Sequence, residues 1–433
     1  MTVSPAGRIR LPVLFAVAFV DMVGLTMILP LLPFYAKDLG ANATLVGFLI
    51  AAFSVAQLAV APVWGRFSDR YGRRPAILAG LLVTAAAYLL FALAGALITL
   101  FLSRIVQGIG GGTIGVVQAY VADASPLDRR TRSLGWLSAV TSLGAVAGPA
   151  FGSLMIGLGG QRAPGLAAAA LAGLVAVFAW RFLRESHAPR RGSTDPGVPR
   201  TTGRAAIARV LTHWSDPASR LVWIYAVAIG AFYGTGQTAP LLLAERFGIT
   251  ERNVGYFIMY LGGMGVVVRS LILGPAVDRL GEARLSRLGI VVLALGLGLT
   301  GLAHSFLLLG IGFTLMPFGT AFLFPCVTGL LSRVVPTRER GLYMGVQHTF
   351  GGVSRSAFPI AAGLAMDRFG IGVPFWIAGI MVLLTLPLTG EMAGYLAAQP
   401  TTGNDALAIS SADVTGEFPV EPAQRPGGRS TDG

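Results

Sequence analysis

The stretch GRFSDRYGRR at residues 65–74 has a weaker copy, GPAVDRLGEA, at residues 274–283. Four residues keep their places at a shift of 209 positions (65 to 274): Gly65, Asp69, Arg70 and Gly72 fall on Gly274, Asp278, Arg279 and Gly281. A second match follows at a shift of 210 (126 to 336): Pro126, Arg130, Gly135 and Pro149 fall on Pro336, Arg340, Gly345 and Pro359. Two matches at nearly one spacing indicate two copies of one structural unit.

The composition places both copies in a membrane. Of the 433 residues, 54% are hydrophobic and 12% are charged, against about 25% charged in an ordinary soluble domain. Apolar stretches long enough to cross about 30 Å of hydrocarbon recur along the chain. We therefore expect twelve membrane-spanning helices, near residues 11–36, 44–64, 75–95, 97–122, 132–157, 163–183, 219–243, 253–274, 286–303, 305–331, 341–365 and 371–392.

Six helices fall in each copy, and because six is an even number both copies enter the membrane from the same side. The predicted fold class is an all-α integral membrane protein with two parallel six-helix repeats, an arrangement that alternating-access transporters use. The predicted parts are an N-terminal bundle (1–183), a cytoplasmic linker (184–218), a C-terminal bundle (219–395) and a disordered cytoplasmic tail (396–433). In the linker, apolar residues at helical spacing predict a short amphipathic helix on the inner leaflet: Ile207, Val210, Leu211 and Trp214.

The net charge of +13 is unevenly placed. Most basic residues fall in the N-terminal arm, the linker and alternate loops, and the opposite loops hold five: Lys37, Arg162, Arg246, Arg252 and Arg368. By the positive-inside rule both termini are cytoplasmic. Basic patches beside membrane ends meet anionic lipid head groups, so we expect lipid and no nucleic acid as partners. Only one of the 33 basic residues is lysine, which favours coding from GC-rich DNA and a bacterial inner membrane.

Several motifs together resemble the major facilitator superfamily, and within it the twelve-helix drug:proton antiporters. They are GLTMILPLLP (24–33), GRFSDRYGRRP (65–75), RIVQG (104–108) and GAVAGPAFG (144–152). The resemblance spans about residues 10–392, and the 65–75 motif is the most specific. The second copy of that motif is degraded, with Glu282 and Ala283 in place of two arginines. Asp21, three residues before the glycine of the first motif, also resembles an acid of tetracycline exporters and vesicular monoamine transporters.

The 65–75 motif predicts a gate at the cytoplasmic side. Its residues, with one acid from the end of the fourth helix, are Gly65, Asp69, Arg70, Gly72, Arg73 and Asp123. The glycines permit a tight turn. The resemblance implies that Asp69 lies at the start of the eleventh helix, near Arg340, and that Asp69, Arg73 and Asp123 form a charge cluster that holds the outward-open state. The alternative is that the arginines only set topology.

The fifth predicted helix carries a doubled GxxxG pattern: Gly144, Gly148, Pro149 and Gly152. Small residues at this spacing allow close helix contact. In the functional interpretation this face seals the contact with the eighth helix between the two halves. In the other interpretation it is generic packing.

Asp21 and Arg104 are charges placed deep in spans, where charge is expensive and usually marks an ion or substrate pathway. Burial favours a neutral acid and a nearby cation favours the carboxylate, a competition that suits a proton carrier. The alternative is a static Asp21–Arg104 pair. The candidate substrate cavity comprises Asp21, Gln107, Phe232, Tyr233, Gln237, Phe318 and Phe322, although aromatic residues at helical spacing also serve packing. Two roles are open for the Arg355 side chain: pairing with backbone carbonyls, or contact with an anion.

These features predict a monomeric, proton-coupled exporter of lipophilic drugs or small organic molecules, including cations. A dedicated exporter of one natural product remains the alternative, and the fifth-helix motif argues against import. No nucleophile–base pair lies at membrane depth, so we do not expect an enzyme. Cys326 is the only cysteine, and no metal site or cofactor is expected beyond the proton gradient.

Overall fold

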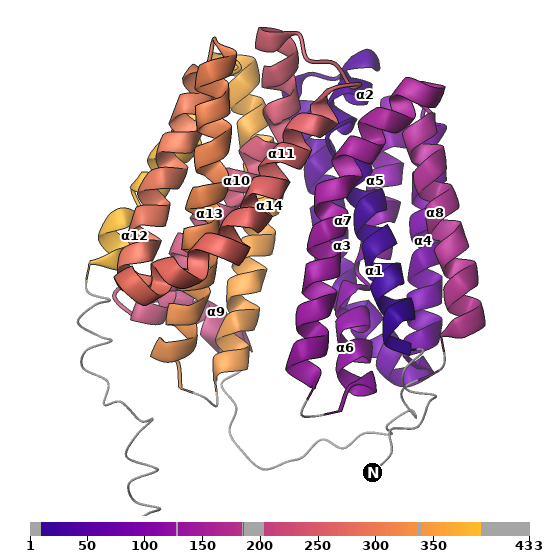
Figure 1. Cartoon of the computed structure of the whole chain (residues 1–433), viewed down its shortest axis with the longest axis horizontal. Coiled ribbons are helices and arrows are strands. Elements are labelled where there is room, and N and C mark those ends of the chain that lie inside the picture. Colours follow the sequence, from indigo (N-terminus) through magenta and orange to yellow (C-terminus); the bar gives the residue numbers. More distant parts are fainter. Residues whose placement is uncertain (1–9, 127–128, 184, 186–202, 337–338, 391–433) are drawn as a thin grey trace, which may run out of the picture. The chain divides into compact units, whose positions relative to one another are not determined.

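The computed structural model describes residues 10–126, 129–183, 185, 203–336 and 339–390, and every regular element in these ranges is helical (Figure 1). The predicted tail and residues 186–202 of the predicted linker lie outside the described residues. Eight helical segments of the described chain are long and apolar enough to cross a membrane. One of them, Val254–Leu302, joins two predicted spans, and the helices α10 and α14 add two that are long enough but more polar.

The described part of the first half contains eight helices because prolines and glycines divide two of the spans. They are α1 (Arg10–Ile28), α2 (Leu32–Asp38), α3 (Ala43–Tyr71), α4 (Arg73–Ala92), α5 (Leu97–Gly111), α6 (Ile114–Ala124), α7 (Arg130–Gly159) and α8 (Ala163–Phe182). Pro33 lies in the first turn of α2, where its missing N–H costs nothing. The predicted first span corresponds to α1 with α2, and the fourth to α5 with α6.

The second half begins with one short helix, and neither its first nor its fourth span is divided. Its elements are α9 (Gly203–Thr212), α10 (Pro217–Phe247), α11 (Val254–Val267), η2 (Val268–Ile272), α12 (Leu273–Leu302), α13 (Phe306–Val334), α14 (Arg340–Phe369), α15 (Val373–Leu383) and η3 (Leu386–Thr389). Each of the remaining predicted spans coincides with helix in this series. The helix α9 packs on α10 and α14 through the buried Ala206 and Val210, while Trp214 stacks on Trp223 of α10 with 5.1 Å between ring centroids.

The repeat is visible in the backbone as well as in the sequence. Gly72, between α3 and α4, has φ of 103°, and Gly281, its counterpart within α12, has φ of 74°. This left-handed region is strained for residues with a Cβ atom. The turn therefore explains why glycine occupies the same place in both copies.

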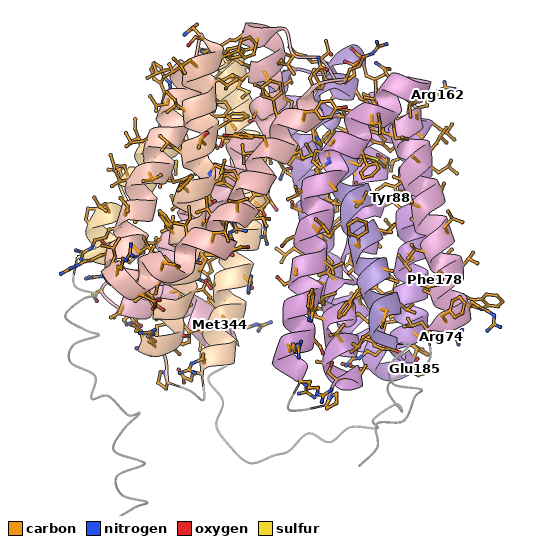
Figure 2. The ribbon with its side chains drawn as sticks, in the orientation of Figure 1. Arg74, Tyr88, Arg162, Phe178, Glu185 and Met344 are labelled. Atoms are coloured by element: carbon orange, nitrogen blue, oxygen red, sulfur yellow. The ribbon has the colours of Figure 1, made fainter. Side chains whose placement is uncertain are left out.

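The two most extensive contacts between the halves are α3 with α14 and α7 with α11, and α10 makes smaller contacts with α2 and α3. The helices α1–α8 form one group in Figure 1 and α9–α15 another. Arg162 lies at one end of the bundle, and Arg74 and Met344 lie at the other (Figure 2). We name the two ends of the bundle after Arg162 and Arg74.

Candidate substrate and proton site

Asp21 lines a cavity in the first half of the chain. This cavity has a volume of about 780 Å³ and lies between α1, α4, α6 and α7. Its polar lining consists of Thr84, Thr113, Gln118, Ser138 and Thr141, and Asp21 is the single acidic or basic residue of that lining. The Asp21 carboxyl group therefore faces a space large enough for a small molecule.

Arg104 is fully buried in α5 and lies behind this cavity, outside its lining. Its Nη1 donates to Oε1 of Gln107, and its guanidinium lies 4.8 Å from the centroid of the Phe53 ring. Its Nε and Nη2 have no hydrogen-bond partner, and neither does Nε2 of Gln107. Buried donors without partners are costly, so a structural role alone does not account for them.

Asp21 and Arg104 do not form an ion pair in the described part of the chain. Tyr88 of α4 is near both: it is buried, interacts electrostatically with Asp21 and Arg104, and forms a hydrogen bond with the Gln107 side chain. A Cβ atom at Gly24, one turn beyond Asp21, would lie 2.9 Å from the Tyr88 hydroxyl oxygen. The sequence contained no signal for Tyr88, because an aromatic residue in an apolar helix is usually packing. Figure 2 shows it between the two ends of the bundle.

The three charged residues predicted at the 65–75 motif come together at the Arg74 end. Nη1 of Arg73 lies 2.7 Å from Asp69, and its Nε lies 3.4 Å from Asp123. Arg73 also donates to Ser68 Oγ at 2.6 Å. The expected contact of Asp69 with the start of α14 is absent: in the described chain no hydrogen bond or ion pair joins them, and the Asp69 side chain is 63% exposed. The charge cluster of Asp69, Arg73 and Asp123 therefore forms within the first half, without the expected contact to α14 of the second half.

Glu185 is a functional candidate that the sequence did not reveal. Its carboxylate accepts from the backbone N–H groups of Arg73 and Arg74 at 2.9 and 3.1 Å, at the first turn of α4. A helix N-terminus favours an anion at this position. Figure 2 shows Glu185 beside Arg74, so the end of α8 is tied to the turn at Gly72.

The glycines of the fifth predicted span face a helix of their own half. That span is α7, and its glycines pack on α1 within the same half: a Cβ at Gly144 would lie 2.7 Å from the Phe19 carbonyl oxygen, and one at Gly148 would overlap Thr26. Gly152 likewise meets Met27. A glycine face predicts close approach but does not say to which helix.

A neighbouring face of α7 makes the contact with α11, the eighth predicted span. Ser153 Oγ accepts from the Gly255 N–H at 3.0 Å and donates to the Glu251 carbonyl at 2.8 Å. A Cβ at Gly255 would overlap the carbonyl oxygen of Pro149. Within the 144–152 motif, Val146 and Pro149 therefore lie at this contact between halves, and the closest approach comes from a glycine of α11.

Asp367, at the Arg162 end of α14, makes a further contact between halves. Its carboxylate accepts from the N–H groups of Ala43 and Thr44 at 3.0 and 2.8 Å and from the Thr44 hydroxyl at 2.6 Å. These are the first residues of α3, whose N–H groups have no partner within the helix. The sequence offered no signal for this contact, because its donors are mainly backbone groups.

We expect Asp367→Asn to loosen the Arg162 end. Hydrogen bonds to a charged acceptor contribute about 1.5–3 kcal/mol each, and an amide oxygen replaces only part of that. Hydrogen–deuterium exchange at the first turn of α3 should accelerate in this variant and stay unchanged in Asp278→Asn, which removes an exposed acid of α12. Unchanged protection of Ala43 and Thr44 would contradict this role.

The remaining predicted cavity residues lie apart from Asp21. Phe322 and Phe318 belong to an apolar cluster with Val268 and Cys326, so packing explains them. Phe232 and Tyr233 of α10 contact each other edge-on at 5.6 Å. Neither these residues nor Gln107 and Gln237 line the Asp21 cavity. That cavity lies inside the first half, whereas α10 and α13 belong to the second.

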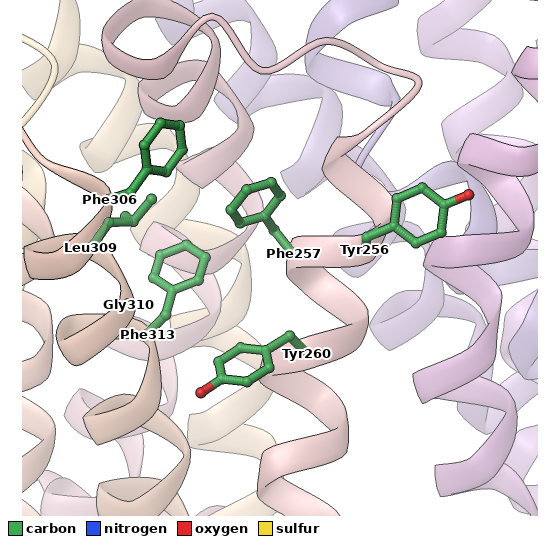
Figure 3. Close-up of a pocket in the computed structure, with 7 residues that line it drawn as sticks. All are labelled: Tyr256, Phe257, Tyr260, Phe306, Leu309, Gly310 and Phe313. Carbon is green, nitrogen blue, oxygen red and sulfur yellow. The ribbon is translucent and has the colours of Figure 1, made fainter.

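A second, aromatic pocket lies between α11 and α13 and has a volume of about 300 Å³. Figure 3 shows Phe257 facing Phe306 and Phe313 across it, while Tyr256 points the other way. The Tyr260 hydroxyl is 2.7 Å from Thr314 Oγ1. No ionisable acid or base lines this pocket, so it offers apolar surface without a means of proton coupling.

The structure has two helical halves that meet at one end of the bundle, and one half holds a cavity lined by a single acid. This architecture is typical of a membrane transporter for small molecules. The sequence model of the Major Facilitator Superfamily matches residues 14–273 and 258–402. The chain belongs to this superfamily.

Characterised relatives are similar along most of their length. Multidrug resistance protein 2 of Bacillus subtilis (strain 168) is 29% identical over 382 residues, which cover 87% of this chain and 93% of that protein. Tetracycline resistance protein, class C, of Escherichia coli is 31% identical over 349 residues, which cover 77% of this chain and 83% of that protein.

Solved structures show the same fold at lower identity. A bacterial homologue of the human lysosomal transporter Spinster, in an inward-facing and unoccupied conformation, superposes with a TM-score of 0.72 at 16% identity, over 91% of this chain and 97% of that one. The human organic anion transporter MFSD10 (TETRAN) superposes with a TM-score of 0.64 at 24% identity, over 89% of this chain and all of that one.

Proposed function

We propose that the chain is a proton-coupled exporter of lipophilic small molecules, including cations, that works by alternating access. The observation that carries this proposal is the position of Asp21, the single acid in the lining of a cavity of about 780 Å³. Similarity to the multidrug and tetracycline resistance proteins supports drug-like substrates. An intramembrane acid that faces a cavity is suited to carry a proton.

In the proposed cycle the Arg74 end faces the cytoplasm of a bacterial inner membrane, and both termini lie on that side. The contacts made by Asp367 and Gly255 close the outer end, so the structure corresponds to an inward-facing state. Asp21 accepts a proton from the outside and carries it inward. It releases the proton when substrate binds or when Tyr88 and Arg104 stabilise the carboxylate. The cluster of Arg73, Asp69 and Asp123 is then available to meet α14 when the inner end closes.

This cycle needs no bound cofactor and no catalytic residues, and it is complete in a monomer surrounded by lipid. The test is export in inverted membrane vesicles with an imposed pH gradient, inside acidic. Adding a transported dye should collapse the gradient, and an uncoupler should abolish dye uptake. Dye uptake that proceeds unchanged without a gradient would contradict proton coupling, and uptake driven by ATP in its absence would exclude the proposed mechanism.

A further inference from the structure

Arg355 lies midway along α14, at the level where α14 and α3 separate. Closer to the Arg162 end the two helices touch: a Cβ at Gly363 would overlap the Ala43 carbonyl oxygen, and one at Gly47 would overlap that of Pro359. Near Arg355 the approach is looser, with 3.5 Å from a Cβ at Gly352 to Leu58.

Beyond this level, toward the Arg74 end, the helices have parted. Cβ atoms built at Gly345 and Gly341 of α14 would meet nothing within 4 Å, and neither would one at Gly65 of α3. His348, on the same face of α14, is exposed. Arg355 is therefore at the closed tip of the space between α3 and α14.

Among the described residues, the positive charge of Arg355 has no acidic partner. In the described chain the structure gives it no ion pair and no hydrogen bond to a backbone carbonyl, so the carbonyl pairing considered for this residue does not occur. Its guanidinium lies 5.9 Å from the centroid of the Tyr233 ring, and its charge acts on Tyr225 and His348. An arginine stays ionised at any relevant pH, and a charge at this depth is costly unless it serves a pathway.

We propose that Arg355 binds an anionic group of the transported molecule, so that the substrates include lipophilic molecules with a carboxylate, sulfonate or phenolate. The planar guanidinium binds such oxyanions through paired N–H donors. Tyr233, 40% exposed, offers an aromatic surface beside it for the body of the ligand. This inference deepens the proposed function and rests on it, because the bound anion is a substrate only if the chain is the proposed exporter. The binding site itself does not depend on proton coupling.

The test is equilibrium binding to the purified, full-length protein in phosphatidylcholine nanodiscs, with no proton gradient present. The probes are 1-pyrenebutyrate and its uncharged methyl ester, which differ in one negative charge and are followed by fluorescence. We expect the native protein to prefer the anion, and Arg355→Met to weaken anion binding by roughly tenfold or more, as for loss of a charge-assisted hydrogen bond. Binding of the ester should be unchanged in this variant, which also shows that it is folded.

Two further variants sharpen the result. Arg355→Lys keeps the charge but not the planar donor pair and should retain part of the preference. Arg269→Met removes an exposed arginine of η2 and should leave the preference intact. Equal binding of the two probes by the native protein would overturn the proposal, and so would a preference that survives in Arg355→Met. Failure of proton coupling in vesicles, with the preference retained, would reject the proposed function and leave this site standing.

Discussion

Asp21→Asn is expected to abolish substrate-driven proton movement completely while leaving substrate binding measurable. Asparagine has nearly the shape of aspartate but cannot exchange a proton near neutral pH. The cavity lining supplies no second acid to take over. In inverted vesicles with an imposed pH gradient, dye added to this variant should leave the gradient at the level of vesicles that lack the protein.

Two controls separate this effect from a folding defect. Asp21→Glu restores a carboxyl group at nearly the same place and should recover part of the coupling. Asp278→Asn removes an exposed acid, the counterpart of Asp69 in the second copy, and should couple normally. Proton movement in Asp21→Asn equal to that of the native protein would remove Asp21 from the mechanism and return the Tyr88 and Arg104 arrangement to a purely structural role.

The second large effect is expected for Gly255→Ala, which should prevent tight closure of the Arg162 end. The added methyl group would overlap the carbonyl oxygen of Pro149 and lie 2.7 Å from Ser153 Oγ. Overpacking of this kind costs about 1–3 kcal/mol, and backbone atoms cannot move away as side chains do. A cost of that size shifts a two-state equilibrium by about 5- to 150-fold, so transport should fall because one of the two states is rarely reached.

The matched control lies two turns along the same helix. A Cβ at Gly263 would be 3.8 Å from Val146, an ordinary contact, so Gly263→Ala should transport normally. Spin labels on cysteines introduced at Arg162 and Arg252, in a Cys326→Ala background, would report the separation of the halves at this end. A distance distribution in Gly255→Ala that matches the native one would contradict the assignment of this contact.

The sequence was sufficient for the helices and for the repeat. The spacing between Gly65 and Gly274 predicted two equivalent copies, and the shared left-handed turn at Gly72 and Gly281 agrees with it. Hydropathy located each span because a helix in lipid must satisfy its own backbone. It missed the divisions inside the first and fourth spans, which are local consequences of proline and glycine.

The site was only partly predictable. A charged residue within an apolar stretch is easily recognised in a sequence, so Asp21, Arg104 and Arg355 were found. The charges of the 65–75 motif were found as well. The partners of Asp367 and Glu185 were not, because both carboxylates bind backbone N–H groups at helix starts, which have no residue signature. The sequence also could not predict which helix packs against the α7 glycines, because a face of small residues allows close approach of any helix.

The turn at Gly72 has a mechanical consequence. A single residue separates α3 from α4, and Glu185 fastens the end of α8 to the same point through the α4 backbone. Because the connection is one residue long, a tilt of α3 should also move α4 and the end of α8. We therefore expect α3, α4 and the end of α8 to move as one rigid unit when the halves rock.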